Sequence, residues 1–173
     1  TTAEMLADGK IVGWFQGRSE FGPRALGHRS ILADPRLPTM KDEINKLVKF
    51  RDEFRPFAPA VAQSFASIPF DIDLPSPFMT VAFPVRKEWQ AKLPAITHVN
   101  ETARVQTVSS EQSPEFDALL GAFGKITGTP VVLNTSFNIK CQPIIETPLE
   151  ALATFAATGL DALVMGPYVV RKL

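Results

Sequence analysis

An arginine-rich stretch over residues 17–30 is the first candidate for chemistry in this sequence. GRSEFGPRALGHRS carries Arg18, Arg24 and Arg29 among three glycines and one proline, which is typical of a structured loop or a broken helix. Guanidinium groups match phosphate oxygens two at a time and glycines let backbone NH groups approach closely, so the loop suits a phosphate. Exposed arginines in weak surface ion pairs would give the same pattern. Glu20 could orient an arginine, hold Mg²⁺ or form a surface ion pair.

A second basic group, Lys49, Arg51 and Arg55, follows at the end of a helix expected over about residues 40–52. Cations at this position also complement the negative end of a helix dipole, so a solvated helix end predicts the same residues. Lys49 and Arg51 cannot share a helical face, and Lys49 and Arg55 converge only if the FRPFAP turn redirects the chain. Residues 18–55 hold nine basic and six acidic residues, although the whole chain has a net charge of zero.

Further polar candidates lie in or beside predicted strands. Arg104 belongs to RVQTV, and an arginine in a cleft among apolar neighbours needs an anion. Asn134 and Ser136 follow an apolar strand expected over 130–133, where open α/β sheets place ligand contacts. Their side chains and that of Asn138 could hold phosphate, ribose or carbamoyl groups, and a polar turn without a ligand would look the same.

The elements that would position these residues alternate between strands and helices. Strands are expected over residues 11–16, 30–33, 79–85, 103–108, 130–133, 162–165 and 168–171. Helices are expected over 3–6, about 40–52, 113–128 and 147–159. The Pro-rich residues 68–78 could form a lid or a mobile loop. This alternation favours an α/β architecture with a mixed sheet. Neither the P-loop nor the GxGxxG pattern occurs, so any nucleotide is held in another way.

Composition limits the class of protein. A chain of 173 residues and 19.0 kDa with 45% hydrophobic residues fits one globular domain. The single cysteine, Cys141, excludes an internal disulfide and favours a cytoplasmic protein. Two histidines and one thiol are too few for the usual ligands of a structural zinc site, so we expect no metal-ligating residues. No apolar run approaches the roughly 20 residues of a membrane span, and the zero net charge argues against nucleic-acid binding. Because the chain opens on a helical stretch without Met, we expect a segment of a longer protein.

Four strings, in this order, resemble the C-terminal domain of the carbamoyltransferase family, which includes nodulation and antibiotic O-carbamoyltransferases. They are GWFQGRSEFGPRALGHRSILADPR, VKFRDEFRPFAPAV, RVQTV, and TGTPVVLNTSFN followed by PII. The resemblance covers nearly the whole chain, from Ala3 to about Val170. It implies an α/β, YrdC-like fold, a twisted sheet of parallel and antiparallel strands with flanking helices. Residues 1–173 would then be a single C-terminal domain of a two-domain enzyme.

The resemblance also implies an activity. The domain would combine ATP with carbamoyl phosphate, in the presence of Mg²⁺, to make carbamoyl-adenylate, and an N-terminal acceptor domain of the same polypeptide would transfer the carbamoyl group to a hydroxyl. The positions that match the family's ligand-binding residues, which we expect to converge on one cleft, are Arg24, Lys49, Arg55, Arg104, Asn134 and Ser136. Of these, Lys49, Arg55 and Arg104 are the expected catalytic residues. The nucleotide- and substrate-binding set is completed by Arg29, Arg51 and Asn138.

Two segments depart from the family pattern. Cys141-Gln142-Pro143-Ile144 stands where the family usually has Gly-Glu-Pro-Ile, and His98-Val99-Asn100-Glu101 stands where it usually has His-x-Asp-Gly. Loss of an acid and two glycines could alter Mg²⁺ coordination or backbone approach and lower the activity. These departures favour the main alternative, a non-catalytic nucleotide- or anion-binding regulatory module. A third alternative, an RNA-binding domain, is disfavoured by the zero net charge and by the sparse interleaving of aromatic and basic residues.

Overall fold

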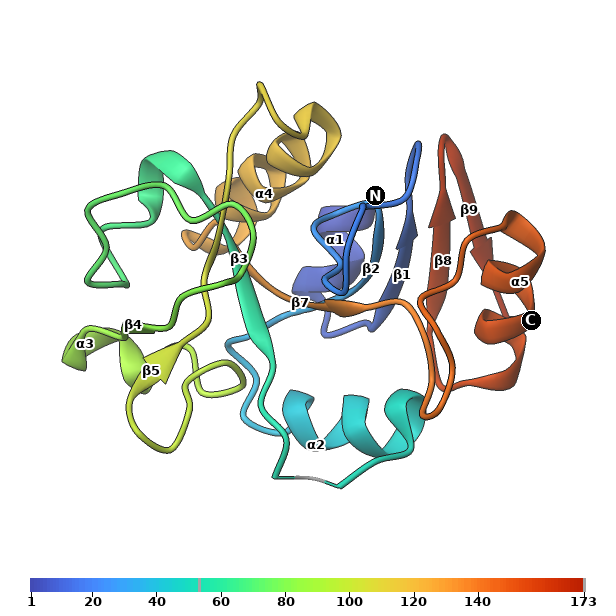
Figure 1. Ribbon diagram of the computed structural model, residues 1–173, viewed down its shortest axis with the longest axis horizontal. Coiled ribbons are helices and arrows are strands. Elements are labelled where there is room, and N and C mark those ends of the chain that lie inside the picture. Colours follow the sequence, from blue (N-terminus) through green and yellow to red (C-terminus); the bar gives the residue numbers. More distant parts are fainter. Residues whose placement is uncertain (53, 173) are drawn as a thin grey trace.

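A mixed β-sheet forms the centre of the protein in the computed structural model, which describes residues 1–52 and 54–172 (Figure 1). Its seven strands lie in the order β6-β3-β7-β2-β1-β8-β9. They are β1 (Val12–Phe15), β2 (Arg29–Ala33), β3 (Ala58–Ala62), β6 (Gln106–Val108), β7 (Val131–Ser136), β8 (Ala162–Met165) and β9 (Tyr168–Arg171). The β1/β8 and β3/β6 pairs are parallel and the other pairs are antiparallel, so the predicted mixed α/β sheet is confirmed.

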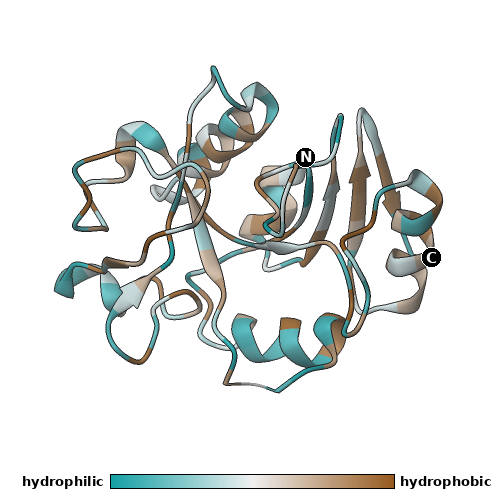
Figure 2. Ribbon diagram, in the orientation of Figure 1, coloured by the Kyte–Doolittle hydropathy of each residue, from teal (hydrophilic) through white to brown (hydrophobic). Residues whose placement is uncertain are grey.

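Helices cover both faces of this sheet. They are α1 (Thr2–Ala7), α2 (Met40–Ile44), the π-helix η1 (Asn45–Lys49), the 3₁₀-helix η2 (Gln63–Phe65), α3 (Lys87–Gln90), α4 (Pro114–Thr127) and α5 (Pro148–Ala157). Side chains alternate across a strand, so Leu32 of β2 packs in one core with Leu6 and Phe116, and Ile31 packs in the other with Ile44. Figure 2 shows the apolar strands in brown and long hydrophilic stretches in teal on α2. No helix in the described ranges is long and apolar enough to cross a membrane.

The two longest helices begin and end close to their predicted limits. Gly128 caps α4 in the left-handed conformation with φ 73°. The predicted capping box of α5 is present, because Thr147 accepts from the Glu150 backbone and the Glu150 carboxylate accepts from the Thr147 backbone. The predicted end of α5 at Gly159 is wrong by two residues. Gly159 instead approaches Leu47 so closely that a Cβ would lie 2.7 Å from the Leu47 Cβ.

Two predicted strands differ from the structure. Of the expected strand 79–85, residues 83 and 84 form strand β4 (Phe83–Pro84) and Val85 forms an isolated bridge with Phe70, and Met79 has φ 53°, which breaks an extended run. The expected strand 103–108 is divided between two sheets. β5 (Thr102–Ala103) pairs with β4 in a separate ladder and β6 pairs with β3, so Arg104 lies in the link between them.

Three further segments also differ. The helix expected to residue 52 ends at Lys49, because Phe50 takes the left-handed conformation with φ 49°, and its second half is a π-helix. Asn134 to Ser136 lie inside β7 rather than after it, because pairing with β3 reaches Asn134 and pairing with β2 extends the strand to Ser136. The Pro-rich stretch 68–78 is packed against the protein, with Phe70 fully buried and the Ser76 hydroxyl donating to the Val105 carbonyl.

Candidate anion-binding site

One cavity collects five of the nine predicted site residues. It has a volume of about 310 Å³ and lies where η1, the following turn and the end of β7 meet. The predicted residues that line it are Lys49, Arg51, Arg55, Ser136 and Asn138. Asp52, Ile139, Lys140, Cys141 and Gln142 complete the wall. Lys140 was not singled out in the sequence, where it is one more lysine in a polar turn.

Lys49 is the buried centre of this cavity, with only 3% of the residue exposed. Its ammonium donates to the Asn138 side-chain oxygen at 2.8 Å, the Asn138 carbonyl at 3.1 Å, the Ser136 hydroxyl at 3.3 Å and the Ser136 carbonyl. Burial lowers the pKa of Lys49 to about 7, and the positive charge of Arg51 adds to this effect. The π-helical turn that delivers Lys49 is a feature often found at functional sites.

The turn after Lys49 brings both arginines to the same cavity. Because Phe50 is left-handed, Arg51 and Arg55 leave the helical path that would have separated them from Lys49. Asn45, which is fully buried, holds this turn: its side-chain oxygen accepts from Arg51 Nε at 2.8 Å, and its amide donates to the Arg55 carbonyl at 3.3 Å. Sequence reasoning missed Asn45, although a polar residue between the apolar Ile44 and Val48 is a signal for such a role.

Arg24, Arg104 and Asn134 form a second group that does not line this cavity. Burial lowers the pKa of Arg104, and the nearby charge of Arg24 lowers it further. Within the described residues, Arg104 Nε and the Asn134 side-chain oxygen are buried without a hydrogen-bond partner. The Asn134 amide donates to the Ala25 carbonyl at 3.1 Å, which joins the arginine-rich loop to β7. Asn134 and Ser136 lie two residues apart on β7 and therefore share a face, so the strand connects the two groups.

The cations of both groups form no ion pair with a carboxylate of the described residues 1–52 and 54–172. Among the ion pairs formed by the described part of the chain, none involves Lys49, Arg51, Arg55, Arg24 or Arg104. Burial lowers the pKa of Arg51, and Arg55 lowers it further by like-charge repulsion. Arg24 and Arg55 are exposed, whereas Lys49 is buried and Arg51 and Arg104 are half-buried. Buried and half-buried cations gathered in this way are typical of a site that is completed by an anion. The geometry therefore fits a phosphate-bearing ligand.

Arg29 takes a different position from the other predicted arginines. Its guanidinium donates to four backbone carbonyls at 3.1–3.2 Å, those of Gln16, Gly17, His28 and Glu146. The residue is 3% exposed and does not line the cavity. Arg29 therefore fixes the ends of the arginine-rich loop to β1 and to the segment before α5 instead of presenting its guanidinium to the cavity.

Glu20 holds the arginine-rich loop, residues 17–30, through hydrogen bonds to the backbone of that loop. One of its carboxylate oxygens accepts hydrogen bonds from the backbone NH groups of Leu26 at 2.6 Å, His28 at 2.8 Å and Arg29 at 3.2 Å. This oxygen therefore binds backbone amides, a role that the sequence did not indicate for Glu20. A carboxylate shared by three amides holds the glycine-rich turn that carries Arg24.

Replacing Glu20 by alanine is expected to loosen this loop. Hydrogen bonds to a charged acceptor contribute about 1.5–3 kcal/mol each, so amide exchange at Leu26 and His28 should accelerate at least about tenfold. Native-state hydrogen exchange followed by NMR measures these two amides directly. Glu4→Ala, which removes only a surface pair with the terminal amine, serves as the control and should leave them unchanged. Unaltered protection in Glu20→Ala would contradict the role given to Glu20.

Both departures from the family pattern fall on left-handed backbone. Cys141 has φ 64° and Glu101 has φ 61°, and each occupies a position where the family usually has glycine. A side chain in this conformation crowds the following carbonyl and costs about 1 kcal/mol, whereas glycine adopts it freely. Cys141 and Gln142 also line the Lys49 cavity, so this departure bears on the site itself.

Cys141→Gly and Glu101→Gly are each expected to raise the free energy of unfolding by about 0.5–1 kcal/mol. Urea denaturation measures the change, with Cys141→Ser as a control that keeps the strained backbone. A glycine variant less stable than the wild-type protein would show that the Cys141 or Glu101 side chain contributes more than its backbone strain removes. In the double variant Cys141→Gly/Gln142→Glu, nucleotide binding should be maintained or improved.

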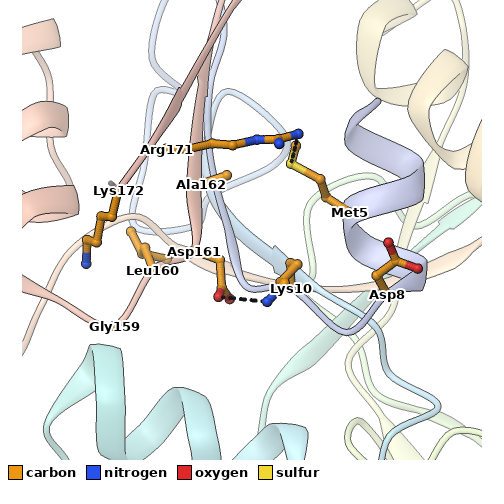
Figure 3. A pocket seen from close by; sticks show the side chains of 9 residues that line it. All are labelled: Met5, Asp8, Lys10, Gly159, Leu160, Asp161, Ala162, Arg171 and Lys172. Atoms are coloured by element: carbon orange, nitrogen blue, oxygen red, sulfur yellow. Dashed lines mark hydrogen bonds and ion pairs between the residues drawn. The ribbon is translucent and has the colours of Figure 1, made fainter.

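Another cavity, of about 540 Å³, has none of the predicted site residues in its lining, which Figure 3 shows. It is formed by α1 and the segment after it together with the segments around β8 and β9. Lys10 and Asp161 form an ion pair at 3.5 Å there, and the Arg171 guanidinium contacts the Met5 sulfur at 3.7 Å. Its lining mixes two acids, Asp8 and Asp161, with three bases, whereas the Lys49 cavity is mainly basic and has Asp52 as the sole acid among its described lining residues.

Comparison with known families gives a match over almost the whole chain. A family model described as "Carbamoyltransferase C-terminus" matches residues 3–172. Nodulation protein NolNO of Sinorhizobium fredii is 51% identical over 98% of this chain and 25% of its own length. Nodulation protein NolO of Bradyrhizobium diazoefficiens is 49% identical over 99% of this chain and 32% of its own length. The chain thus spans a quarter to a third of these relatives.

Solved structures confirm the fold. The crystal structure of full-length HypF in its phosphate- and nucleotide-bound form superposes with a TM-score of 0.68 at 16% identity, over 96% of this chain and 24% of that chain. HypF of T. kodakarensis superposes with a TM-score of 0.63 at 17% identity, over 99% of this chain and 20% of that chain. The YrdC-like, mixed-sheet fold implied by the sequence strings is therefore confirmed.

Proposed function

This chain belongs to the carbamoyltransferase C-terminus family, and we propose that it is the carbamoyl-activating domain of an O-carbamoyltransferase, forming carbamoyl-adenylate from ATP and carbamoyl phosphate. The observation that carries the proposal is the Lys49 cavity. Lys49, Arg51 and Arg55 converge there with Ser136 and Asn138, and none of the three cations forms an ion pair with a described carboxylate, in a chain whose family transfers carbamoyl groups.

The proposed reaction joins two anions, and the site supplies what that requires. Carbamoyl phosphate reacts with water to give carbamate and inorganic phosphate. A carbamate oxygen then attacks the α-phosphorus of ATP while the bond to pyrophosphate breaks. The products are carbamoyl-adenylate, pyrophosphate and phosphate. Lys49 and Arg55 would offset the repulsion between nucleophile and triphosphate and stabilise the charge that develops on phosphorus.

The second group would bind the other anionic part of the substrates. Arg104 has a buried Nε without a hydrogen-bond partner among the described residues, and Arg24 lies near enough to lower the pKa of Arg104. An anion between the two would accept from this Nε and offset the repulsion between the guanidinium groups. The free side-chain oxygen of Asn134 could accept from the amide of a carbamoyl group. Catalysis would then consist of positioning and electrostatics, without a covalent enzyme intermediate.

Mg²⁺ fits this site only as a companion of the nucleotide. The described residues contain no group of three or more His, Cys, Asp or Glu side chains able to hold a metal ion. Asp52 is the one carboxylate that this part of the chain offers to the cavity. Mg²⁺ commonly binds through one or two carboxylates together with substrate phosphates and water, and its chemical contribution is to neutralise phosphate charge.

Transfer to a hydroxyl acceptor would belong to an N-terminal domain of the same polypeptide. The relatives are three to four times longer than the part matched here, which leaves room for such a domain in them. We propose a cytoplasmic location, because both substrates are cytoplasmic metabolites and the chain has a single cysteine.

Incubation with labelled carbamoyl phosphate and Mg-ATP tests the proposal. The chain should form carbamoyl-adenylate with an equal amount of pyrophosphate, and it should label no hydroxyl acceptor such as an aminoglycoside or a lipochitooligosaccharide. Acceptor labelling by this chain alone would contradict the division between two domains. Nucleotide binding without turnover would favour the regulatory module, which the departures at Cys141 and Glu101 support.

A further inference from the structure

Two exposed phenylalanines lie beside the Lys49 cavity. Phe50 is 48% exposed and Phe54 is 79% exposed, and both line an open groove of about 600 Å³. Arg51, Asp52 and Lys140 line this groove and the Lys49 cavity alike, so the two hollows share a wall. A basic cavity for phosphates thus opens directly onto an aromatic surface.

The backbone at Phe50 places the ring and the ammonium on opposite sides of one turn. Lys49 is buried against Ser136 and Asn138, whereas the next residue in the chain is half exposed in the groove. Phe50 achieves this with φ 49°, a conformation that is rare for a bulky side chain. Strain of this kind is concentrated at functional sites, and here it holds an aromatic ring next to the cations.

We propose that Phe50 and Phe54 stack the base of the nucleotide whose phosphates enter the Lys49 cavity. This inference rests on the proposed function and adds the position at which the base of the nucleotide binds. A single exposed apolar side chain needs no explanation, but two rings beside a mainly basic cavity match the two halves of a nucleotide, an aromatic base and a polyanion. The shared wall of Arg51 and Lys140 lies where the ligand would pass from one hollow to the other.

Stacking also predicts the selectivity of the site. Every base has an aromatic face, so a stacking platform tolerates exchange of one base for another and favours larger rings. ATP and GTP should therefore bind with affinities within a few fold of each other, and a pyrimidine triphosphate should bind more weakly. Phe54→Trp, which enlarges the ring, should preserve or raise the affinity.

The test compares a ligand with a base and a ligand without one. Isothermal titration calorimetry in Mg²⁺ gives the dissociation constants of ATP and of inorganic tripolyphosphate for the wild-type protein, Phe50→Gly, Phe54→Ala and the double variant. Phe50→Gly removes the ring and the backbone strain together, so it should fold. The double variant should bind ATP about ten- to a hundredfold more weakly and tripolyphosphate as the wild type does. Phe78→Ala, which removes an exposed ring outside this groove, is the matched control.

The outcomes separate this inference from the proposed function. If the wild-type protein binds ATP and tripolyphosphate equally well, or if the double variant loses both equally, the platform is refuted while the phosphate site stands. Unchanged ATP binding in the double variant refutes it as well. If the wild-type protein binds neither ATP nor tripolyphosphate, the proposed function and the stacking of the base on Phe50 and Phe54 are both refuted.

Discussion

Lys49→Ala is expected to lower the rate of carbamoyl-adenylate formation at least about tenfold, which corresponds to a loss of roughly 1.4 kcal/mol of transition-state stabilisation. Lys49 is the most buried cation of the cavity, and its ammonium holds the Ser136 and Asn138 oxygens that shape the opposite wall. Its loss would remove positive charge where the triphosphate must meet a second anion. Arg104→Ala should have a similar effect, because Arg104 carries the unpaired buried Nε of the second group.

The rate is measured by pyrophosphate release at saturating Mg-ATP and carbamoyl phosphate. Lys41→Ala, in the same helical segment and paired only with Asp42 at 3.7 Å, is the matched control and should keep the wild-type rate. Because Lys49 is buried, circular dichroism and urea denaturation must show that the variant folds, and Lys49→Met offers a replacement of closer shape. A folded Lys49→Met protein with full activity would exclude Lys49 from catalysis.

Sulfate binding is expected to weaken as the pH rises above about 7. Burial and the charge of Arg51 lower the pKa of Lys49 to about 7 in the free protein, and a bound anion favours the charged ammonium and raises this pKa. The association constant is therefore greatest below the free-state pKa and falls as the pH passes through it, by roughly tenfold between about pH 6.5 and pH 8.5. Sulfate keeps its charge over this range, so the slope reports on the protein.

The titration is best made on a Cys141→Ser background, which removes the thiol from the cavity wall. In Lys49→Arg the guanidinium stays charged throughout, so the pH dependence should disappear. The same slope in Lys49→Arg and in the parent protein would assign the titration to another group. Calorimetry in buffers of different ionisation enthalpy adds a second measure, because sulfate binding near pH 8 should take up a proton.

The sequence predicts the elements of this fold more successfully than their limits. β1, β8, β9, α4 and the capping box of α5 follow from local patterns of apolar spacing, proline, glycine and Thr147 with Glu150. The errors arise where the limits of a strand are set by pairing with strands that are distant in the sequence. β7 extends through Ser136 because β2 pairs with it as far as that residue, and residues 103–108 divide because their two ends join different sheets.

Five residues that line the candidate cavity were singled out from the sequence, but their arrangement was not predictable. Family strings single out Lys49, Arg55 and Ser136, but their convergence depends on the left-handed Phe50, which no helical pattern predicts. The roles of Glu20 and Arg29 depend on backbone groups, and backbone groups carry no sequence signal. The division of the expected single cleft into the Lys49 cavity and the Arg24/Arg104 group likewise depends on tertiary packing.

The most direct test of the account is an experimental structure of the protein with Mg²⁺ and a non-hydrolysable ATP analogue. We predict that the phosphates lie in the Lys49 cavity, with phosphate oxygens within hydrogen-bond distance of the Lys49 ammonium and the Arg55 guanidinium. Phosphates bound instead in the cavity of Lys10 and Arg171, with the Lys49 cavity empty, would contradict the central claim.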